Sequence, residues 1–204
     1  MSDVAQRSWV DVAALGASLL SGSWYALRRP LLQRADVRAG DALRLAGSPV
    51  LDRAVVATTD LGSVYAVAGI AATLLASRQP GAAADVAGTG LAAWFLAQGG
   101  KTRVRRERPY EAHGVRRLIH PPTGSSYPSG HAAVAAATMT VLADRVRPSR
   151  KMAFKLLGGY VAASRVYVGV HYPSDVLGGA GLGIVLGALA RGPVNGAVSQ
   201  RFSG

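Results

Sequence analysis

The stretch Pro-Ser-Gly-His-Ala-Ala-Val-Ala-Ala-Ala-Thr-Met-Thr-Val-Leu-Ala, residues 128–143, decides the fold. Its first three residues are typical of a helix start, with Ser129 as the N-cap and Gly130 leaving room for a close approach of the backbone. The twelve residues after His131 carry no charge. A run this apolar is typical of a helix in a bundle that crosses a bilayer. We therefore expect a membrane-spanning helix at residues 130–145.

Similar runs without a charge occur on both sides of this stretch, at residues 61–77, 86–100, 156–164 and 176–190. A span needs about 20 residues, so several helices must extend past a charged residue near the interface. The expected spans are 54–77, 82–99, 130–145, 152–168 and 174–190. Residues 1–27 form either an interfacial helix or a sixth span. The predicted fold class is an all-α, multi-pass transmembrane bundle of five or six spans, with the active site at one membrane face.

Composition supports this interpretation and excludes several classes of protein. Half of the 204 residues are hydrophobic and the mean hydropathy is +0.22, which is too apolar for a disordered chain. The absence of cysteine excludes disulfide frameworks, thiol nucleophiles, zinc ribbons and iron–sulfur clusters. The net charge of +12 does not indicate nucleic-acid binding, because apolar runs of lipid length separate the basic residues. A soluble, Ala-rich helical bundle is the alternative fold.

The chain divides into three regions by charge and hydropathy. Residues 1–53 are predicted to form N-terminal interfacial helices or an extra span, with Pro30, Gly40 and Pro49 as breakers. Residues 54–191 are the predicted catalytic transmembrane domain, and residues 192–204 a short C-terminal tail. The longest non-helical stretch, residues 101–127, is rich in arginine. A loop of this length is usually functional, although cations beside membrane helices also serve only to meet anionic lipid.

The predicted topology brings polar clusters together at one membrane face. Antiparallel helices place the end of the second span, the start of the third, the end of the fourth and the start of the fifth on the same side. Seven side chains at these ends can converge: Lys101, Arg108, Ser129, His131, Arg165, His171 and Asp175.

These residue types suit phosphoryl transfer. Three cations and the amino terminus of a helix form a site for a multiply charged anion. Because histidine titrates near pH 6.5, one imidazole can attack in its neutral form while another is protonated and donates. Asp175, four residues after His171, is placed to hold the second ring nitrogen of that histidine.

Three motifs carry a resemblance to a known family: Lys101-x6-Arg108-Pro109, Pro128-Ser129-Gly130-His131 and Ser164-Arg165-x5-His171-x3-Asp175. Together they resemble the signature of the type 2 phosphatidic acid phosphatase family, and every defining position matches in type, order and spacing. That family comprises membrane lipid phosphate phosphatases and shares its fold and phosphate pocket with vanadium haloperoxidases.

The resemblance implies a role for each matching residue. His171 would attack phosphorus and form a phosphohistidine, with Asp175 orienting it. His131 would protonate the departing oxygen and then activate water. The phosphate would be held by Lys101, Arg108, Ser129, the Gly130 amide and Arg165. The family needs no metal or cofactor, and one carboxylate among many cations is a poor site for Mg²⁺.

The predicted function is hydrolysis of a lipid phosphate or pyrophosphate by an integral protein of the plasma membrane. Candidate substrates are phosphatidic acid, phosphatidylglycerol phosphate, a polyprenyl pyrophosphate and a polyprenyl-linked sugar phosphate, and the expected partners are this substrate and membrane lipids. The alternatives are a vanadium-dependent haloperoxidase and a non-catalytic lipid-binding scaffold. If residues 1–27 cross the membrane, Lys and Arg divide 14 to 9 between the motif side and the other side, or 11 to 9 without the pocket candidates. This balance leans slightly to a cytoplasmic site and leaves the orientation open.

Overall fold

The structure, a computed structural model, describes residues 3–45 and 47–191. Over these residues the chain forms helices and no strand, which confirms the all-α prediction for this part of the chain. The predicted C-terminal tail, residues 192–204, lies outside the described residues. The elements are α1 (Asp3–Ala26), α2 (Pro30–Leu45), α3 (Pro49–Thr58), the 3-10 helix η1 (Thr59–Gly62), α4 (Val64–Ala76), α5 (Pro80–Arg103), α6 (Pro109–Ala112), α7 (Gly130–Asp144), α8 (Pro148–Tyr167) and α9 (Pro173–Arg191).

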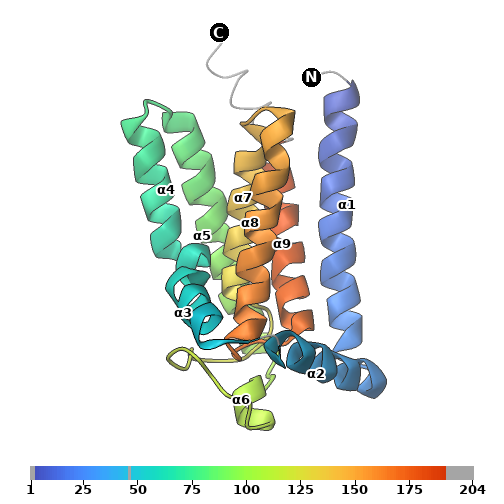
Figure 1. The fold of residues 1–204 in the computed structure, drawn as a ribbon. Coiled ribbons are helices and arrows are strands. Elements are labelled where there is room, and N and C mark those ends of the chain that lie inside the picture. The colour runs from blue at the N-terminus through green and yellow to red at the C-terminus, as the bar shows by residue number, and fades with distance from the viewer. Residues whose placement is uncertain (1–2, 46, 192–204) are drawn as a thin grey trace.

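The long helices α1, α4, α5, α7, α8 and α9 run side by side (Figure 1). The short or tilted helices α2, α3 and α6 lie together at one end of this bundle, which we call the site end. The turns that join α4 to α5 and α7 to α8 lie at the opposite, far end. Pro80 and Pro148 begin α5 and α8 just after these turns, since proline suits the first position of a helix.

Helix α7 is the centre of the bundle, as its apolar sequence predicts. Every residue from Ala132 to Met139 is buried, and α7 packs against α5, α8 and α9. The approach of α9 to α7 requires glycine, because a Cβ at Gly183 would collide with the carbonyl oxygen of Ala133. Helix α1 packs along the other side of α9.

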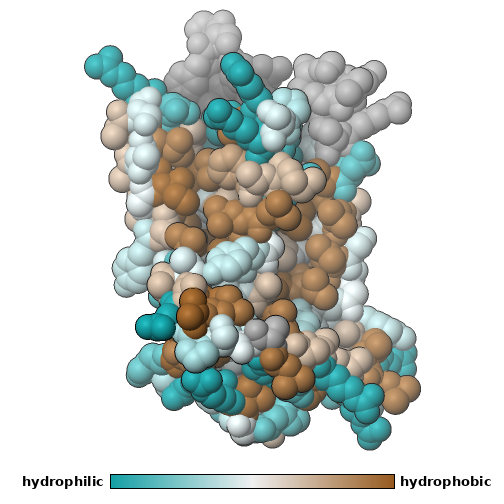
Figure 2. Space-filling view, viewed as in Figure 1, coloured by the Kyte–Doolittle hydropathy of each residue, from teal (hydrophilic) through white to brown (hydrophobic). Residues whose placement is uncertain are grey.

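The visible face of the bundle is apolar at mid-height (Figure 2). Figure 2 shows hydrophobic residues across the middle of the visible face and hydrophilic residues at both ends. Large exposed hydrophobic side chains on the long helices include Leu15, Leu75, Phe95 and Leu156. An apolar surface of this extent is typical of contact with a membrane or another protein.

The number of spans stays a prediction. Among the described helices, α9 alone is long and apolar enough to cross a membrane by itself. The number rises to as many as three if the bent pairs α1–α2 and α3–α4 each count as one span.

The predicted continuous helix at 54–77 is wrong. The chain there forms α3, η1 and α4, with a bend of 68° between the helical segments before and after Ser63. Ser63 is extended and its hydroxyl accepts a hydrogen bond from the amide of Ala66, which starts α4 afresh. The break turns Thr59 and Asp60 toward the polar site end, where they contact Arg165.

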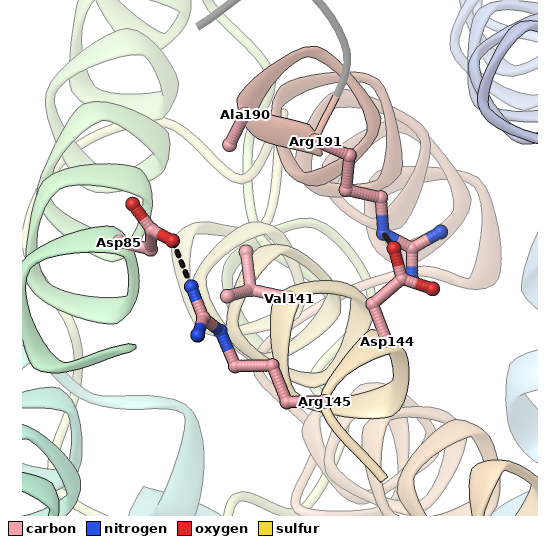
Figure 3. A pocket seen from close by; sticks show the side chains of 6 residues that line it. All are labelled: Asp85, Val141, Asp144, Arg145, Ala190 and Arg191. Carbon is pink, nitrogen blue, oxygen red and sulfur yellow. Dashed lines mark hydrogen bonds and ion pairs between the residues drawn. The ribbon is translucent and has the colours of Figure 1, made fainter. Parts of the chain in front are cut away.

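Ion pairs join three helices at the far end (Figure 3). Arg145, the residue just after α7, pairs with Asp85 of α5, and Arg191 of α9 pairs with Asp144 of α7. These four side chains surround a small cavity of about 230 Å³. At this cavity, therefore, carboxylates compensate the charges of Arg145 and Arg191.

Candidate active site

The ends of α5, α7, α8 and α9 meet at the site end, and they carry the residues that the motifs select (Figure 1). Lys101 lies in the last turn of α5, and Arg108 lies in the loop just before α6. Ser129 precedes the first turn of α7, and Arg165 lies in the last turn of α8. His171 and Asp175 lie just before and in the first turn of α9.

His171 is 2% exposed and has a different neighbour at each ring nitrogen. Arg108 Nη1 lies 3.4 Å from its Nε2, whereas Ser126 Oγ at 3.5 Å and Asp175 Oδ2 at 3.6 Å lie beside its Nδ1. Because a guanidinium can only donate, this arrangement favours the lone pair on Nε2 and the proton on Nδ1. Burial lowers the pKa of the His171 imidazole to about 4, because the protonated ring would lose its hydration. At neutral pH the side chain is therefore an uncharged base.

Asp175 is fully buried, and both of its oxygens accept hydrogen bonds. Ser126 Oγ donates to Oδ2 at 2.5 Å, and the Tyr172 amide donates to the same oxygen at 2.8 Å. Arg106 Nη1 donates to Oδ1 at 2.6 Å. These contacts hold the carboxylate with Oδ2 beside the His171 ring.

Arg108 is fully buried and binds backbone carbonyl groups. Its donors contact the carbonyls of Val170 at 2.9 Å and Gly124 at 3.1 Å, and two further carbonyls at 3.3 Å. No carboxylate within the described residues forms an ion pair with it. Burial lowers the pKa of Arg108, because the site offers its charge little hydration. The result is a fixed cation beside His171 Nε2.

Two more cations extend the positive site. Arg165 is 2% exposed; its Nη1 donates to Thr59 Oγ1 at 2.9 Å, and its Nε donates to none of the described residues. Lys101 is close enough to Arg108 and Arg165 to interact with both charges. Like charges are gathered here at an electrostatic cost, which a bound anion would relieve.

The amino terminus of α7 also lies at this site. Ser129 is buried, and its hydroxyl caps the helix by accepting a hydrogen bond from the Ala132 amide at 3.4 Å. Its own amide donates to the Asp175 carbonyl at 2.9 Å, which ties α7 to α9. The first amides of a helix have no partner within that helix and favour an anion.

His131 follows in the first turn of α7 and is more accessible than His171, with its side chain 30% exposed. Its Nε2 lies 3.2 Å from Asp60 Oδ1, and the same oxygen lies 3.6 Å from Arg165 Nη1. Asp60 thus links His131 to Arg165, and the bond from the Ser129 amide to the Asp175 carbonyl brings the start of α7 to the start of α9, so His131 and His171 lie at one site.

The turn that leads to His171 depends on Gly169. Its φ of +80° is in the left-handed region, and a Cβ there would lie 2.5 Å from the Arg116 carbonyl oxygen. The Leu118 amide donates to the Val168 carbonyl at 3.1 Å and holds the same turn against the long loop.

Several residues at this site lie outside the motifs: Asp36, Thr59, Asp60, Arg106 and Ser126. Asp60 could have been found from the sequence, because it is the one charged residue within the otherwise uncharged stretch 54–77. The others had none, because their partners are far away along the chain.

Comparisons with known proteins support one family. The model of the PAP2 superfamily matches residues 81–195. Over 84 residues, the chain is 38% identical to the undecaprenyl-diphosphatase BcrC of Bacillus subtilis, covering 40% of this chain and 42% of BcrC. It is 37% identical over 86 residues to phosphatidylglycerophosphatase B of the same organism, covering 37% and 41%. It is 35% identical over 89 residues to decaprenylphosphoryl-5-phosphoribose phosphatase of Mycobacterium tuberculosis, covering 44% and 48%. The matches thus span less than half of each curated relative.

Solved structures match over more of the chain. A transmembrane PAP2-type phosphatidylglycerolphosphate phosphatase from Bacillus subtilis superposes with a TM-score of 0.73 at 25% identity, covering 94% of this chain and 96% of that one. LpxE of Aquifex aeolicus gives a TM-score of 0.69 at 27% identity, with 75% and 92% covered. Because the first match covers nearly the whole chain, most of the first fifty residues have structural counterparts.

Proposed function

The chain belongs to the PAP2 superfamily, and from this membership and the site geometry we propose that it is a membrane phosphatase that hydrolyses a lipid phosphate or pyrophosphate. The observation that carries the proposal is the cluster of His131, His171, Arg108 and Arg165 at one end of the bundle. The named relatives act on polyprenyl and glycerophospholipid phosphates, which supports a lipid substrate.

In the first step, His171 Nε2 attacks phosphorus and the bond from phosphorus to the leaving oxygen breaks. Asp175 stabilises the imidazolium that forms, through its Oδ2 at 3.6 Å from Nδ1. His131 gives a proton to the leaving oxygen, which departs as a lipid alcohol or, from a pyrophosphate, as a lipid monophosphate. The product on the enzyme is a phosphohistidine.

In the second step, water attacks the phosphohistidine and His131 accepts its proton. The bond from phosphorus to Nε2 breaks, and inorganic phosphate leaves. In both steps the negative charge on the phosphoryl oxygens is stabilised by the side chains of Lys101, Arg108 and Arg165 and by the backbone amide of Gly130. The residues suffice for these steps without a metal, which is part of the proposal.

The apolar surface beside the site favours a substrate with a lipid tail. The tail can stay in the membrane while the phosphate enters the cationic site end. The specific lipid is one of the four candidate classes from the sequence, and the plasma membrane is the proposed location.

The proposal is tested by assaying purified protein on phosphatidic acid, phosphatidylglycerol phosphate, undecaprenyl pyrophosphate and a polyprenyl-linked sugar phosphate, with a water-soluble phosphomonoester beside them. We expect phosphate release from at least one lipid, a clear preference over the soluble ester, and no release by His171→Ala. His120→Ala is the matched control, because His120 is an exposed histidine of the long loop that forms no side-chain hydrogen bond or ion pair with the described site residues, and it should keep wild-type activity.

Preference for the soluble ester would contradict the lipid assignment. Full activity of His171→Ala would contradict the nucleophile assignment. Halide oxidation with vanadate and peroxide, without phosphate release, would favour the haloperoxidase alternative.

A further inference from the structure

Arg106, which the three motifs do not include, is clamped between two carboxylates. Its Nη1 donates to Asp175 Oδ1 at 2.6 Å, and its Nη2 donates to Asp36 Oδ2 at 2.7 Å. The guanidinium also lies over the Tyr172 ring at 3.9 Å from the centroid, and Nη1 donates to Ser174 Oγ at 2.7 Å. With contacts on both edges and one face, this side chain has little freedom to move.

Asp36 brings α2 into the same network. It is 9% exposed, and its Oδ1 accepts a hydrogen bond from the Ser174 amide at 2.8 Å while its Oδ2 accepts one from Ser174 Oγ at 2.5 Å. Its carboxylate therefore lies at the amino terminus of α9, where the helix dipole favours negative charge. Asp36 is 138 residues from Ser174 along the chain, so only the fold joins them.

Arg106 binds the Asp175 oxygen that faces away from His171. A buried carboxylate with one free oxygen could rotate about its side-chain bond and lose the orientation that His171 needs. The contact at Oδ1 resists that rotation, while Ser126 and the Tyr172 amide hold Oδ2. The charge of Arg106 also compensates a carboxylate that has no exposure to solvent.

We propose that Arg106 and Asp36 are positioning residues for the phosphoryl-transfer reaction: Arg106 holds the Asp175 carboxylate toward His171, and Asp36 holds Arg106. The inference rests on the proposed function of the same site. Neither side chain contacts the cluster of phosphate-binding candidates, so both act through Asp175.

The first test compares Arg106→Gln with Arg106→Lys. Arg106→Gln should lower kcat by about tenfold or more, a loss comparable with that of outer partners of histidines in other sites. KM should change little, because Arg106 lies outside the phosphate cluster. In this variant Arg106 no longer compensates the negative charge of Asp175, so Asp175 stabilises the protonated form of His171 more strongly. The acid limb of the kcat/KM profile should therefore move to higher pH. Arg106→Lys keeps the charge and should leave this limb near its wild-type position, with an intermediate kcat.

The other charged groups that face His171 are unchanged in these variants: Arg108 from the loop, Arg165 from α8 and Asp175 from α9. Arg105→Gln is the matched control, because it removes the same charge from the neighbouring position. Arg105 is exposed and makes no ion pair with the residues that the structure describes. It should keep the wild-type kcat and acid limb. A merely structural role of Arg106 would change thermal stability without moving the acid limb.

The second test is a double-mutant cycle between Arg106→Gln and Asp36→Asn. If Asp36 acts through Arg106, Asp36→Asn lowers kcat in the wild-type background and has no further effect beside Arg106→Gln. If the two effects multiply, Asp36 acts only by capping α9 and its assigned role is overturned. Should Arg106→Gln fail to fold, Arg106→Lys carries the test: wild-type kcat in that variant would overturn the inference.

A titration that needs no turnover separates this inference from the proposed function. In protein labelled with ¹⁵N-histidine, the His171 resonances are those that disappear in His171→Ala. Arg106→Gln should raise the His171 pKa and Arg105→Gln should not. If the wild type is inactive but Arg106→Gln raises the His171 pKa, only the proposed function is overturned. If the wild type is active but Arg106→Gln leaves the His171 pKa unchanged, only the inference is overturned.

Discussion

The two histidines of the site have contrasting surroundings. His171 is enclosed, with Arg108 at one ring nitrogen and Asp175 near the other. His131 is partly exposed and contacts Asp60, a carboxylate that is itself 76% exposed. The enclosed, oriented ring suits a nucleophile, and the accessible ring suits exchange of a proton with water and with the leaving group.

The neutral state of His171 predicts a low acid limb in the pH profile. Because burial lowers its pKa to about 4, the nucleophilic form persists well below the ordinary histidine range. As the pH falls through this pKa, the ring gains a proton and loses the lone pair that attacks phosphorus in the proposed mechanism, so kcat/KM should fall. The profile is measured with the ionisation of the substrate titrated separately, and samples held at acid pH are reassayed at neutral pH to exclude unfolding. If an acid limb of kcat/KM lies at pH 6.5 or above and does not come from ionisation of the substrate, the lowered pKa of His171 is contradicted.

Asp60 predicts a second effect, on phosphate binding. Its carboxylate contacts His131 and Arg165, the two residues that we propose act on the substrate phosphate. The negative charge of Asp60 therefore repels an incoming anion. Asp60→Asn should therefore tighten inhibition by inorganic phosphate by about two- to fivefold, the range for exposed charge pairs. Asp41→Asn is the control, because it removes an exposed carboxylate of α2 whose ion-pair partner among the described residues is Arg44. An unchanged or weaker inhibition by phosphate in Asp60→Asn would contradict this role.

At the scale of elements, the contact between α7 and α9 fixes the distance between the motifs they carry. The start of α7 bears His131, and the start of α9 follows His171. The two helices pack closely along their length, and the Ser129 amide is bonded to the Asp175 carbonyl. A helix pair that were further apart would separate the two imidazoles.

Gly183→Ala tests this packing. Its Cβ would collide with the backbone of α7 at Ala133, so the variant should lose about 1–3 kcal/mol of stability. Gly88→Ala on α5 is the matched control, since a Cβ there meets no atom within 4 Å. That control should be neutral or gain up to about 1 kcal/mol, because alanine favours helix over glycine. Thermal unfolding in detergent measures both, and equal melting temperatures would contradict the close packing of α7 and α9.

At the scale of the whole molecule, the bundle has two chemically different ends. The site end gathers cations around two histidines, whereas the far end pairs Arg145 with Asp85 and Arg191 with Asp144 (Figure 3). The hydrophobic middle of the visible face lies between them (Figure 2). This distribution predicts that the two ends face opposite sides of a membrane.

Cysteine labelling tests this prediction without a background signal, since the chain contains no cysteine. Ala112→Cys places an exposed thiol at the site end, and Ser149→Cys places one at the far end. In intact cells an impermeant maleimide should label only one of them, and it should label both after permeabilisation. The labelled position also gives the orientation of the site. Labelling of both in intact cells would contradict a transmembrane arrangement.

Much of the fold was predictable from local sequence. The apolar runs and their boundary residues predict helices close to α5, α7, α8 and α9, because charge-free segments bounded by Pro, Ser or Gly are local signals. Gly40, in contrast, was expected to break a helix and lies buried inside α2, where tertiary packing outweighs its low helix propensity. The break at Ser63 was missed for a related reason, since the polar partners that favour it come from α7 and α8.

The sequence by itself determined the family motifs, the residue types of the candidate site and the end of the bundle at which they lie, since helix direction follows from chain order. Only the tertiary structure decided which groups surround them: Asp60 at His131, Ser126 at Asp175, and Arg106 with Asp36 beyond it. The physical reason is that these contacts join residues 49 to 71 positions apart along the chain. Such pairs leave no periodicity in one sequence, and packing alone brings them within hydrogen-bonding distance.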